Sequence, residues 1–377
     1  MKSNNPKTNM LEHSEAKVHL YGAYLSRYLN ILSRNNYVTR IFLFDLLCGE
    51  GILDDGGKGS PIIALEAIKN HYYANEQTCP NVTIWFNDLG ISKIEKNVPK
   101  IERVERFSQK IALPSNVQIS YFQEDYETIY PKAIELVSNT KQSKGLFFID
   151  PYGYKSIKPS DIQKMLMGGN TEVFLWLPIA FMYRFANVAF EKDFPGSEPL
   201  REFLLLLFGK DVPEFKSVYD FIDKITGRFR TFLREQEIFV DFFTLERDPA
   251  NIYCMLFFTS NLKGAEAMIS AKWEMDANRG KGHTIDKSPA FSEIQMSGYT
   301  EKLKSFIGSA EYRTNSELYK FGLENGFLPK HTNEVLRTWR NEDILRLVSL
   351  DGDVVRGFYI EYKSKRRVGF QIVHKLL

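Results

Sequence analysis

Two short polar segments of this sequence combine residue types suited to ligand chemistry, and each closes an apolar run. Asp45-Leu-Leu-Cys48-Gly49-Glu50-Gly51 follows the run 40–44, and Asp150-Pro151-Tyr152-Gly153 follows the run 145–149. Both runs read as buried strands that stop in a glycine-containing turn. In an open α/β sheet, ligands bind just beyond the carboxyl ends of the strands. The two segments therefore predict one crevice lined from two sides, and the chemistry they suggest is group transfer from S-adenosylmethionine.

The first turn and two later strand ends supply the predicted cofactor contacts. Gly49 and Gly51 give the backbone clearance for the methionine part of the cofactor, next to the free amides of a following helix. Asp45 would orient these groups through backbone amides and water. Asp88 ends the second strand and is placed to accept both ribose hydroxyls, in charge-assisted hydrogen bonds. Asp125 follows the third strand and is placed to meet the adenine amino group. Each carboxylate taken alone could equally be a turn or cap residue.

The second segment resembles the Asp-Pro-Pro-Tyr signature of amino-directed nucleic-acid methyltransferases. That resemblance implies that Asp150 and the Pro151 carbonyl accept hydrogen bonds from an exocyclic amine, and that Tyr152 stacks on the extruded base. The segment departs from the signature because one proline is missing and Tyr152 comes one position early. Tyr154 is a second candidate for the stacking ring. The alternative is that Asp-Pro-Tyr-Gly only forms a tight turn.

Other chemistries have less support in the sequence. The six histidines have no spacing suited to a metal, so no metal site is predicted. The first turn lacks the third glycine of a dinucleotide fingerprint. Cys48 is interpreted as the small side chain that this turn needs. Lys17 could reach the cofactor carboxylate, but we interpret it as a solvated lysine on a helix.

The chain alternates strands and helices, which is typical of a mostly parallel, doubly wound sheet with both faces covered. Apolar runs predict strands at 40–45, 82–86, 117–122, 145–149 and 173–177. Helices are predicted at about 14–32, 62–72, 90–108 and 127–138. From about 180 to 236 the apolar spacing is helical, which predicts a helical insertion over the carboxyl edge. A hairpin (239–245 with 252–259) and a helix (264–275) then complete this α/β domain.

The domains expected from these patterns are an α/β domain over 1–276, a polar linker over 277–297 and a smaller domain over 298–377. Three helices and a β-ribbon, with strands predicted around 347–349, 357–362 and 369–375, form the outline of a winged helix. Its third helix offers basic and polar residues to a major groove: Lys330, His331, Thr332, Arg337 and Arg340. The ribbon would place four cations on phosphates: Lys363, Lys365, Arg366 and Arg367. The alternative is a solvated basic hairpin in a protein-interaction module.

Composition sets the remaining limits. The 377 residues are 44% hydrophobic and carry a net charge of +2, so any attraction to nucleic acid must come from a local patch. The three cysteines are scattered, which argues against a disulfide framework and for a reducing compartment. The N-terminus lacks the apolar core of a signal peptide, and no run approaches the ~20 apolar residues of a membrane span. We therefore expect a cytoplasmic protein without a membrane partner.

The whole set of motifs resembles the three-Cys-motif partner proteins, a methyltransferase-like bacterial group. The resemblance rests on His13-Ser-Glu-Ala-Lys17, the 45–51 segment, Gly59-Ser60-Pro61-Ile-Ile-Ala-Leu65, Phe86-Asn87-Asp88, the 148–153 segment and the passage from Tyr253 to Gly264. It covers about residues 10–275, in this order. It implies a Rossmann-like, class I methyltransferase fold, and a partner protein with a three-cysteine motif, because such proteins are often encoded beside family members.

These observations predict an S-adenosylmethionine-dependent methyltransferase that acts on an exocyclic amino group of a nucleobase. Its nucleic acid, with DNA favoured over RNA, would be bound with help from the C-terminal domain. One alternative is a catalytically silent methyltransferase-like scaffold or nucleic-acid-binding subunit of a bacterial multi-protein system, such as a defence system. A small-molecule methyltransferase is a third hypothesis, but it leaves the basic tail unexplained.

Overall fold

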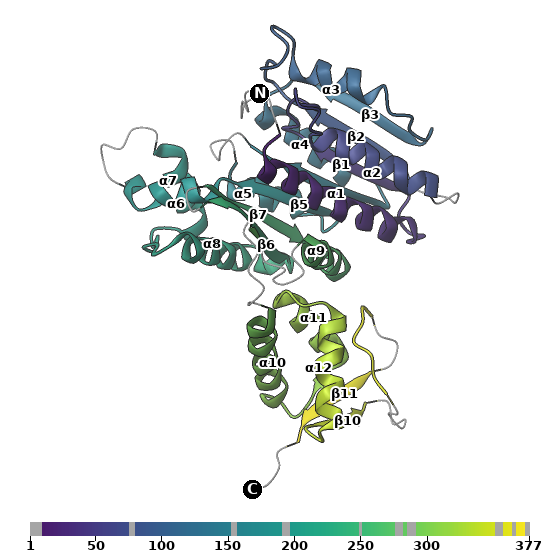
Figure 1. Cartoon of the computed structure of the whole chain (residues 1–377), viewed down its shortest axis with the longest axis vertical. Coiled ribbons are helices and arrows are strands. Elements are labelled where there is room, and N and C mark those ends of the chain that lie inside the picture. The colour runs from purple at the N-terminus through teal and green to yellow at the C-terminus, as the bar shows by residue number, and fades with distance from the viewer. Residues whose placement is uncertain are drawn as a thin grey trace. The chain divides into compact units, whose positions relative to one another are not determined.

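The computed structural model describes residues 10–74, 80–151, 157–190, 197–248, 251–275, 282–284, 292–350, 357–363 and 367–373. These residues form two compact units. The first takes in the chain up to Ser260 together with residues 283–285, and the second consists of residues 261–282 and the chain from Asp286 onward. The N-terminal unit is the purple to green part of Figure 1, and most of the C-terminal unit is green to yellow.

An eight-stranded sheet forms the centre of the first unit, in the order β3-β2-β1-β4-β5-β7-β6-β8. The strands are β1 (Arg40–Asp45), β2 (Asn81–Asn87), β3 (Val117–Phe122), β4 (Ser143–Ile149), β5 (Thr171–Leu177), β6 (Phe239–Asp248), β7 (Asn251–Thr259) and β8 (Gly282–Thr284). Strands β1 to β5 are parallel, whereas β7 runs antiparallel to both β5 and β6. This order with an antiparallel β7 is typical of class I methyltransferases and confirms the predicted α/β fold.

Helices cover both faces of this sheet (Figure 1). The helices of the first half are α1 (Glu12–Ser33), α2 (Ser60–Ala74), α3 (Lys100–Ser108), α4 (Tyr126–Ser138) and α5 (Pro159–Leu166). Alternate residues of β4 show the two layers, because successive strand side chains point to opposite faces. Phe148 packs against Tyr21 of α1, with ring centroids 4.3 Å apart. Phe147 lies in the core with Ile129 of α4 and Ile162 of α5.

The predicted helix over 90–108 begins only at Lys100, and the segment before it is a loop. Pro99 disfavours helical backbone at the residue before it, and Asn97 has a positive φ of 62°. The Ser92 hydroxyl accepts hydrogen bonds from the Ile94 and Glu95 amides and so stabilises a turn. This loop lies beside the glycine turn, and its Lys93 amide donates to Glu50.

Three helices occupy the region of the predicted helical insertion: α6 (Ile179–Ala186), α7 (Glu198–Phe208) and α8 (Val218–Phe232). Short 3-10 turns follow at Val188–Phe190 and Arg234–Gln236. Their apolar faces join one large core with β6 and β7, in which Phe203, Phe229 and Phe258 are each at most 2% exposed. Burial of this aromatic surface anchors the insertion to the sheet.

The second unit contains α9 (Leu262–Met275), α10 (Ser292–Gly308), β9 (Arg313–Thr314), α11 (Asn315–Glu324), α12 (Pro329–Asn341), β10 (Leu345–Ser349) and β11 (Val368–Ile372). The three strands form a small antiparallel sheet in the order β10-β11-β9. The predicted strand at 357–362 is wrong, because residues 357–363 have no strand structure. Asn333 of α12 instead holds this segment through two hydrogen bonds to the Ile360 backbone.

The boundary between the two units differs from the sequence expectation. The helix predicted over 264–275 was expected to complete the α/β domain, but α9 packs within the second unit. The Trp273 indole donates to the Gly326 carbonyl at 2.9 Å, and the Tyr319 hydroxyl donates to Glu266 at 2.6 Å. The expected linker over 277–297 also contains β8, which joins the large sheet, and the first turns of α10.

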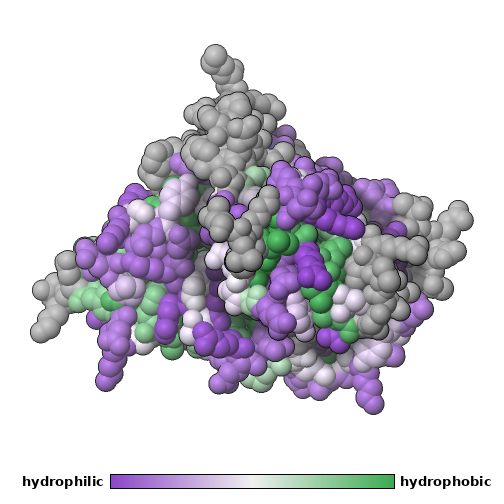
Figure 2. Space-filling view, turned by 90° about the horizontal axis from the view of Figure 1, so that it is seen from below, coloured by the Kyte–Doolittle hydropathy of each residue, from purple (hydrophilic) through white to green (hydrophobic). Residues whose placement is uncertain are grey.

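Within the described residues, no helix combines the length and the apolar character needed to cross a bilayer. Figure 2 shows a face on which hydrophilic residues predominate and hydrophobic residues gather in smaller areas.

Candidate active site

A cavity of about 640 Å³ opens at the carboxyl ends of β1, β4 and β5. Its wall includes the turn after β1 (Cys48 to Gly51), Asp150 and Pro151 after β4, and Trp176 to Pro178 at the end of β5. Further parts of the wall come from α1, the start of α2, α6 and the first residues of β7. The volume lies within the range of about 300–1,000 Å³ that is usual for small-molecule sites. The two segments singled out in the sequence thus share one cavity.

Two glycines shape the turn after β1, and the space around them differs. Gly49 and Gly51 have φ angles of +71° and +75°, which favour glycine. A Cβ on Gly49 would have no atom within 4 Å, so this position borders open space in the cavity wall. A Cβ on Gly51 would lie 3.1 Å from Val104 Cγ2 of α3. Gly49 therefore leaves room for a ligand, while Gly51 allows the turn to pack on α3.

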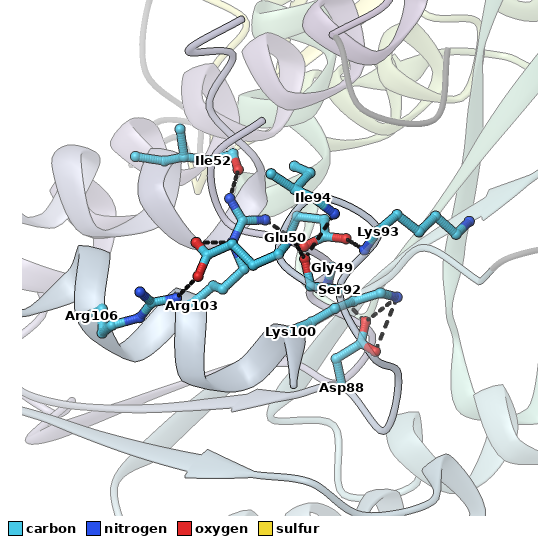
Figure 3. A network of polar contacts seen from close by, with 11 residues as sticks. Gly49, Glu50, Ile52, Asp88, Ser92, Lys93, Ile94, Lys100, Arg103 and Arg106 are labelled. Carbon is cyan, nitrogen blue, oxygen red and sulfur yellow. Dashed lines mark hydrogen bonds and ion pairs between the residues drawn. The ribbon is translucent and has the colours of Figure 1, made fainter. Parts of the chain in front are cut away.

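Charged residues of α3 and its preceding loop hold this turn in place (Figure 3). Arg103 is 3% exposed, and its guanidinium donates to Glu50 at 2.5 Å, to the Ile52 carbonyl at 3.0 Å and to Glu95 at 2.9 Å. The other carboxylate oxygen of Glu50 accepts from the Lys93 amide at 2.8 Å. Charge-assisted bonds of this kind are roughly twice as strong as neutral ones. The sequence does not indicate a part for Arg103 in this site, since a charged residue on a polar helix gives no signal of burial.

Asp88 also stabilises the turn rather than lining the cavity. Its side chain accepts from the Gly49 amide at 3.0 Å and from the Gly90 amide at 2.7 Å. Lys100 Nζ lies 3.2 and 3.3 Å from its two oxygens, and both residues are 5% exposed. Figure 3 shows Asp88 with Gly49 and Lys100. The ribose contact of Asp88 stays a prediction.

Asp45 is the last residue of β1, directly before the turn, and is buried at 2% exposure. Burial, with the nearby Asp150 and Asp88 carboxylates adding to it, raises the pKa of Asp45 to about 8, although Ser60 and Lys17 act in the opposite direction. Neither of its oxygens accepts a hydrogen bond of normal geometry from the described residues. The cavity wall does not include Asp45, so its part in orienting a ligand also stays a prediction.

Asp125 is an exposed helix cap. Its side chain accepts from the Glu127 amide at 3.0 Å and begins α4, which is the alternative that the sequence left open. It does not line the cavity. Contact with an adenine amino group therefore has no geometric support, and remains a prediction.

Asp150 and Lys17 form an ion pair in the cavity wall. One carboxylate oxygen, Oδ2, accepts from Lys17 Nζ, and Oδ1 accepts no hydrogen bond from the described residues. Lys17 Nζ also lies 5.7 Å from the centroid of the Trp176 ring. The interpretation of Lys17 as a solvated lysine is therefore wrong. Pro151 lines the cavity beside Asp150, whereas Tyr152 and Tyr154 lie outside the described residues.

The predicted nucleic-acid contacts divide into exposed and internal residues. Lys330, Arg337 and Arg340 are exposed on α12, and Lys363 and Arg367 are exposed nearer the C-terminus. Lys365 and Arg366 lie outside the described residues.

His331 and Thr332 were expected to face a groove, and this is wrong. Thr332 is 1% exposed and shares a hydrogen bond of 2.6 Å with the Tyr299 hydroxyl. The His331 ring packs on Trp273 with centroids 4.4 Å apart, and burial lowers its pKa to about 4. Thr332 stabilises the second unit from inside, and the half-buried His331 packs against Trp273 of the same unit.

Metal chemistry has no support where the structure is described, since no three His, Cys, Asp or Glu side chains group there as a metal site. Cys48 is buried, and burial raises the pKa of its thiol. This fits the interpretation of Cys48 as a small side chain of the turn.

No protein-family model matches the chain, and no curated protein matches it either. Among solved structures it is similar to protein LPL1258 from Legionella pneumophila, with 15% identity, a TM-score of 0.35 and coverage of 66% of this chain and 86% of the other. It is also similar to the Bacillus cereus O-methyltransferase in complex with SAH, with 10% identity, a TM-score of 0.33 and coverage of 63% and 80%. A third similar structure is Trm1 from Pyrococcus horikoshii with S-adenosyl-L-methionine, at 11% identity, a TM-score of 0.38 and coverage of 98% and 93%. At these identities and TM-scores, the likenesses carry no inference about the activity of this chain.

Proposed function

We propose that this protein is an S-adenosylmethionine-dependent methyltransferase that acts on an exocyclic amino group of a nucleobase. The observation that carries the proposal is the shared cavity of the glycine turn and the Asp150-Pro151 segment. Cofactor and acceptor must meet at one point for methyl transfer, and a cavity that joins both segments at one sheet edge provides this arrangement.

The residues at the glycine turn fit the methionine end of the cofactor. Gly49 borders open space where a ligand can approach the backbone closely. Ser60 begins α2 and lines the same cavity, so free amides at the start of this helix lie nearby. The cofactor would supply the methyl group. Cys48, Gly49, Gly51 and Ser60 would hold its methionine part.

At the acceptor, Asp150 and Pro151 would bind the amine. The Asp150 carboxylate has Oδ2 engaged by Lys17, which fixes its orientation, while Oδ1 remains for a donor. The Pro151 carbonyl would accept the second amine hydrogen, as in the resembling signature. These two contacts would direct the nitrogen lone pair toward the methyl group. Stacking by Tyr152 belongs to this proposal as well.

The second unit would hold the nucleic acid, DNA in preference to RNA. Its order, α10-β9-α11-α12-β10-β11, with an antiparallel three-stranded sheet, supports a winged-helix assignment. Lys330, Arg337 and Arg340 of α12 would contact DNA, and the basic segment from Lys363 to Arg367 would contact phosphates. We further propose membership of the three-Cys-motif partner group, with a three-Cys-motif protein as a possible partner.

One observation favours a second function, that of a catalytically silent scaffold in a bacterial multi-protein system. The Asp88 carboxylate, proposed for the ribose, is already engaged by two backbone amides and Lys100. If these contacts persist, the ribose loses its strongest proposed partner.

Two matched glycine variants test cofactor binding by calorimetric titration of S-adenosylmethionine. Gly49 and Gly56 both have positive φ and open space around a Cβ, but only Gly49 lines the cavity. Gly49→Ala should weaken binding at least about tenfold, equivalent to about 1.4 kcal/mol, and Gly56→Ala should not. Equal effects would contradict a site at this turn, and no binding by the wild type would favour the scaffold.

Asp150→Ala, which removes the acceptor oxygens, tests the reaction. Methyl transfer to DNA should fall at least about 100-fold, while affinity for S-adenosylmethionine stays within about threefold of the wild type. Unchanged transfer would refute the role of Asp150. Asp88→Ala is a poor control here, because it would leave Lys100 buried without its carboxylate partner.

A further inference from the structure

Aromatic rings line the part of the cavity wall that α1, β5, α6 and β7 build. They are His13, Trp176, Phe181 and Tyr253. His13 and Tyr253 are stacked, with centroids 4.6 Å apart and ring planes inclined by 6°. Phe181 is 44% exposed although it is a large apolar side chain. Rings arranged in this way offer flat apolar surface to a planar ligand.

One of these rings also carries an unused donor. Trp176 is 2% exposed, and its indole nitrogen has no hydrogen-bond partner among the described residues. Trp176 therefore contributes the apolar surface of its ring to the cavity wall, while its nitrogen is closed off from the open space.

The charges in the wall point to an anionic group on that ligand. Lys17 is paired with Asp150, and Glu50 is paired with Arg103, so these charges are compensated. Arg184 of α6 is exposed in the cavity and makes no ion pair or hydrogen bond with any described residue. Its guanidinium lies 5.7 Å from the centroid of the Phe181 ring. A planar guanidinium binds phosphate through two parallel hydrogen bonds.

We infer that Phe181, Arg184 and the His13–Tyr253 pair form an acceptor subsite for a nucleoside monophosphate unit, with its base on the rings and its phosphate on Arg184. The inference rests on the proposed function, and it names the substrate class for the same cavity. A free nucleotide and a nucleotide within a strand present the same chemistry to these residues. The helical insertion therefore selects the substrate through α6.

Calorimetric titrations of AMP and adenosine test the phosphate contact. The wild type should bind AMP at least about tenfold more tightly than adenosine, and Arg184→Met should abolish this difference without changing adenosine affinity. Arg184 is exposed, so the variant should unfold at the wild-type temperature. Arg234→Met, an exposed arginine outside the cavity wall, is the matched control and should keep the preference.

Binding of a short single-stranded oligonucleotide, measured by fluorescence anisotropy, distinguishes a free nucleotide from a nucleotide within a strand as the ligand. If AMP does not bind but Arg184→Met weakens oligonucleotide binding at least about fivefold, the unit belongs to a strand and the inference holds. If Arg184→Met changes neither AMP nor oligonucleotide affinity, the inference is refuted. The same variants are titrated with S-adenosylmethionine. If the protein binds S-adenosylmethionine but Arg184→Met changes no nucleotide affinity, only the proposed subsite is refuted. If the protein does not bind S-adenosylmethionine but Arg184→Met clearly weakens nucleotide binding, only the proposed methyltransferase function is refuted.

Discussion

Glu172, at the start of β5, is a buried carboxyl whose protonation should govern part of the folding stability. It is 7% exposed and accepts hydrogen bonds from the hydroxyls of Tyr24 on α1 and Thr259 on β7. Burial raises its pKa to about 7, and these two bonds and the Lys144 charge only partly oppose the shift. Between pH 4.5 and about 7, the folded state therefore holds a proton on Glu172 that the unfolded chain, with an ordinary carboxyl pKa near 4.5, has already released.

The resulting stability is fully present below pH 4.5 and is lost as the pH rises to about 7. The shift corresponds to about 3 kcal/mol. Glu172→Gln, which stays neutral, should therefore be more stable than the wild type at pH 8. Its free energy of unfolding should also fall much less between pH 5 and 7 than that of the wild type. Urea unfolding at a series of pH values measures this. Asp45 also has a raised pKa, so it makes the free energy of unfolding fall with rising pH in the wild type and in the variant alike. Parallel curves for the two proteins would show that Glu172 does not titrate in this range.

At the scale of elements, α3 acts as a support for the glycine turn. Arg103 and Arg106 both bind Glu95, but Arg103 is 3% exposed in its side chain and also holds Glu50, whereas the Arg106 side chain is 54% exposed. Lysine cannot reproduce the forked contacts of a guanidinium. Arg103→Lys should therefore lose about 1.5–3 kcal/mol of stability, which lowers the unfolding midpoint by several degrees.

Arg106→Lys is the matched control and should shift the midpoint by about one degree or less, because exposed ion pairs contribute little. Thermal unfolding of both variants, followed by titration with S-adenosylmethionine at a temperature where each is folded, completes the test. A folded Arg103→Lys protein should bind the cofactor more weakly, since its turn is less fixed. Equal midpoints in the two variants would contradict a supporting role for α3.

The sequence predicts where strands end far better than which strand-end carboxylates face the cavity. Asp88 and Asp150 look alike in sequence, as each follows an apolar run. Lys100, only 12 residues away, engages Asp88 in the turn, while Lys17 reaches Asp150 across 133 residues. Propensity and periodicity are local properties, so they give the elements but not these contacts. For the same reason, Trp273 decides the environment of His331, which the helical pattern of α12 does not indicate.

At the scale of the whole molecule, the net charge of +2 gives little attraction to a polyanion. Binding of nucleic acid therefore depends on a local basic surface, for which we propose the exposed face of α12. Lys330 and Arg337 lie on this face, while Thr332 and Trp339 of the same helix are buried. If these two cations contact phosphates, each binding event releases the counterions that they replace.

Replacing Lys330 and Arg337 with alanine in the full chain should weaken binding to a DNA duplex and reduce its salt dependence. The slope of log affinity against log salt should become shallower by about 0.9 for each lost phosphate contact, or about 2 units for both. Fluorescence anisotropy of a labelled duplex between about 50 and 200 mM salt measures this slope. Lys302→Ala with Lys304→Ala on α10 removes the same charge from two exposed positions of the same unit. If both double variants change the slope equally, binding depends only on the total charge of the second unit. If neither variant changes the slope, α12 does not contact the DNA. A change confined to the α12 variant would instead locate the phosphate contacts on this helix, because the two variants differ only in the surface that has lost its cations.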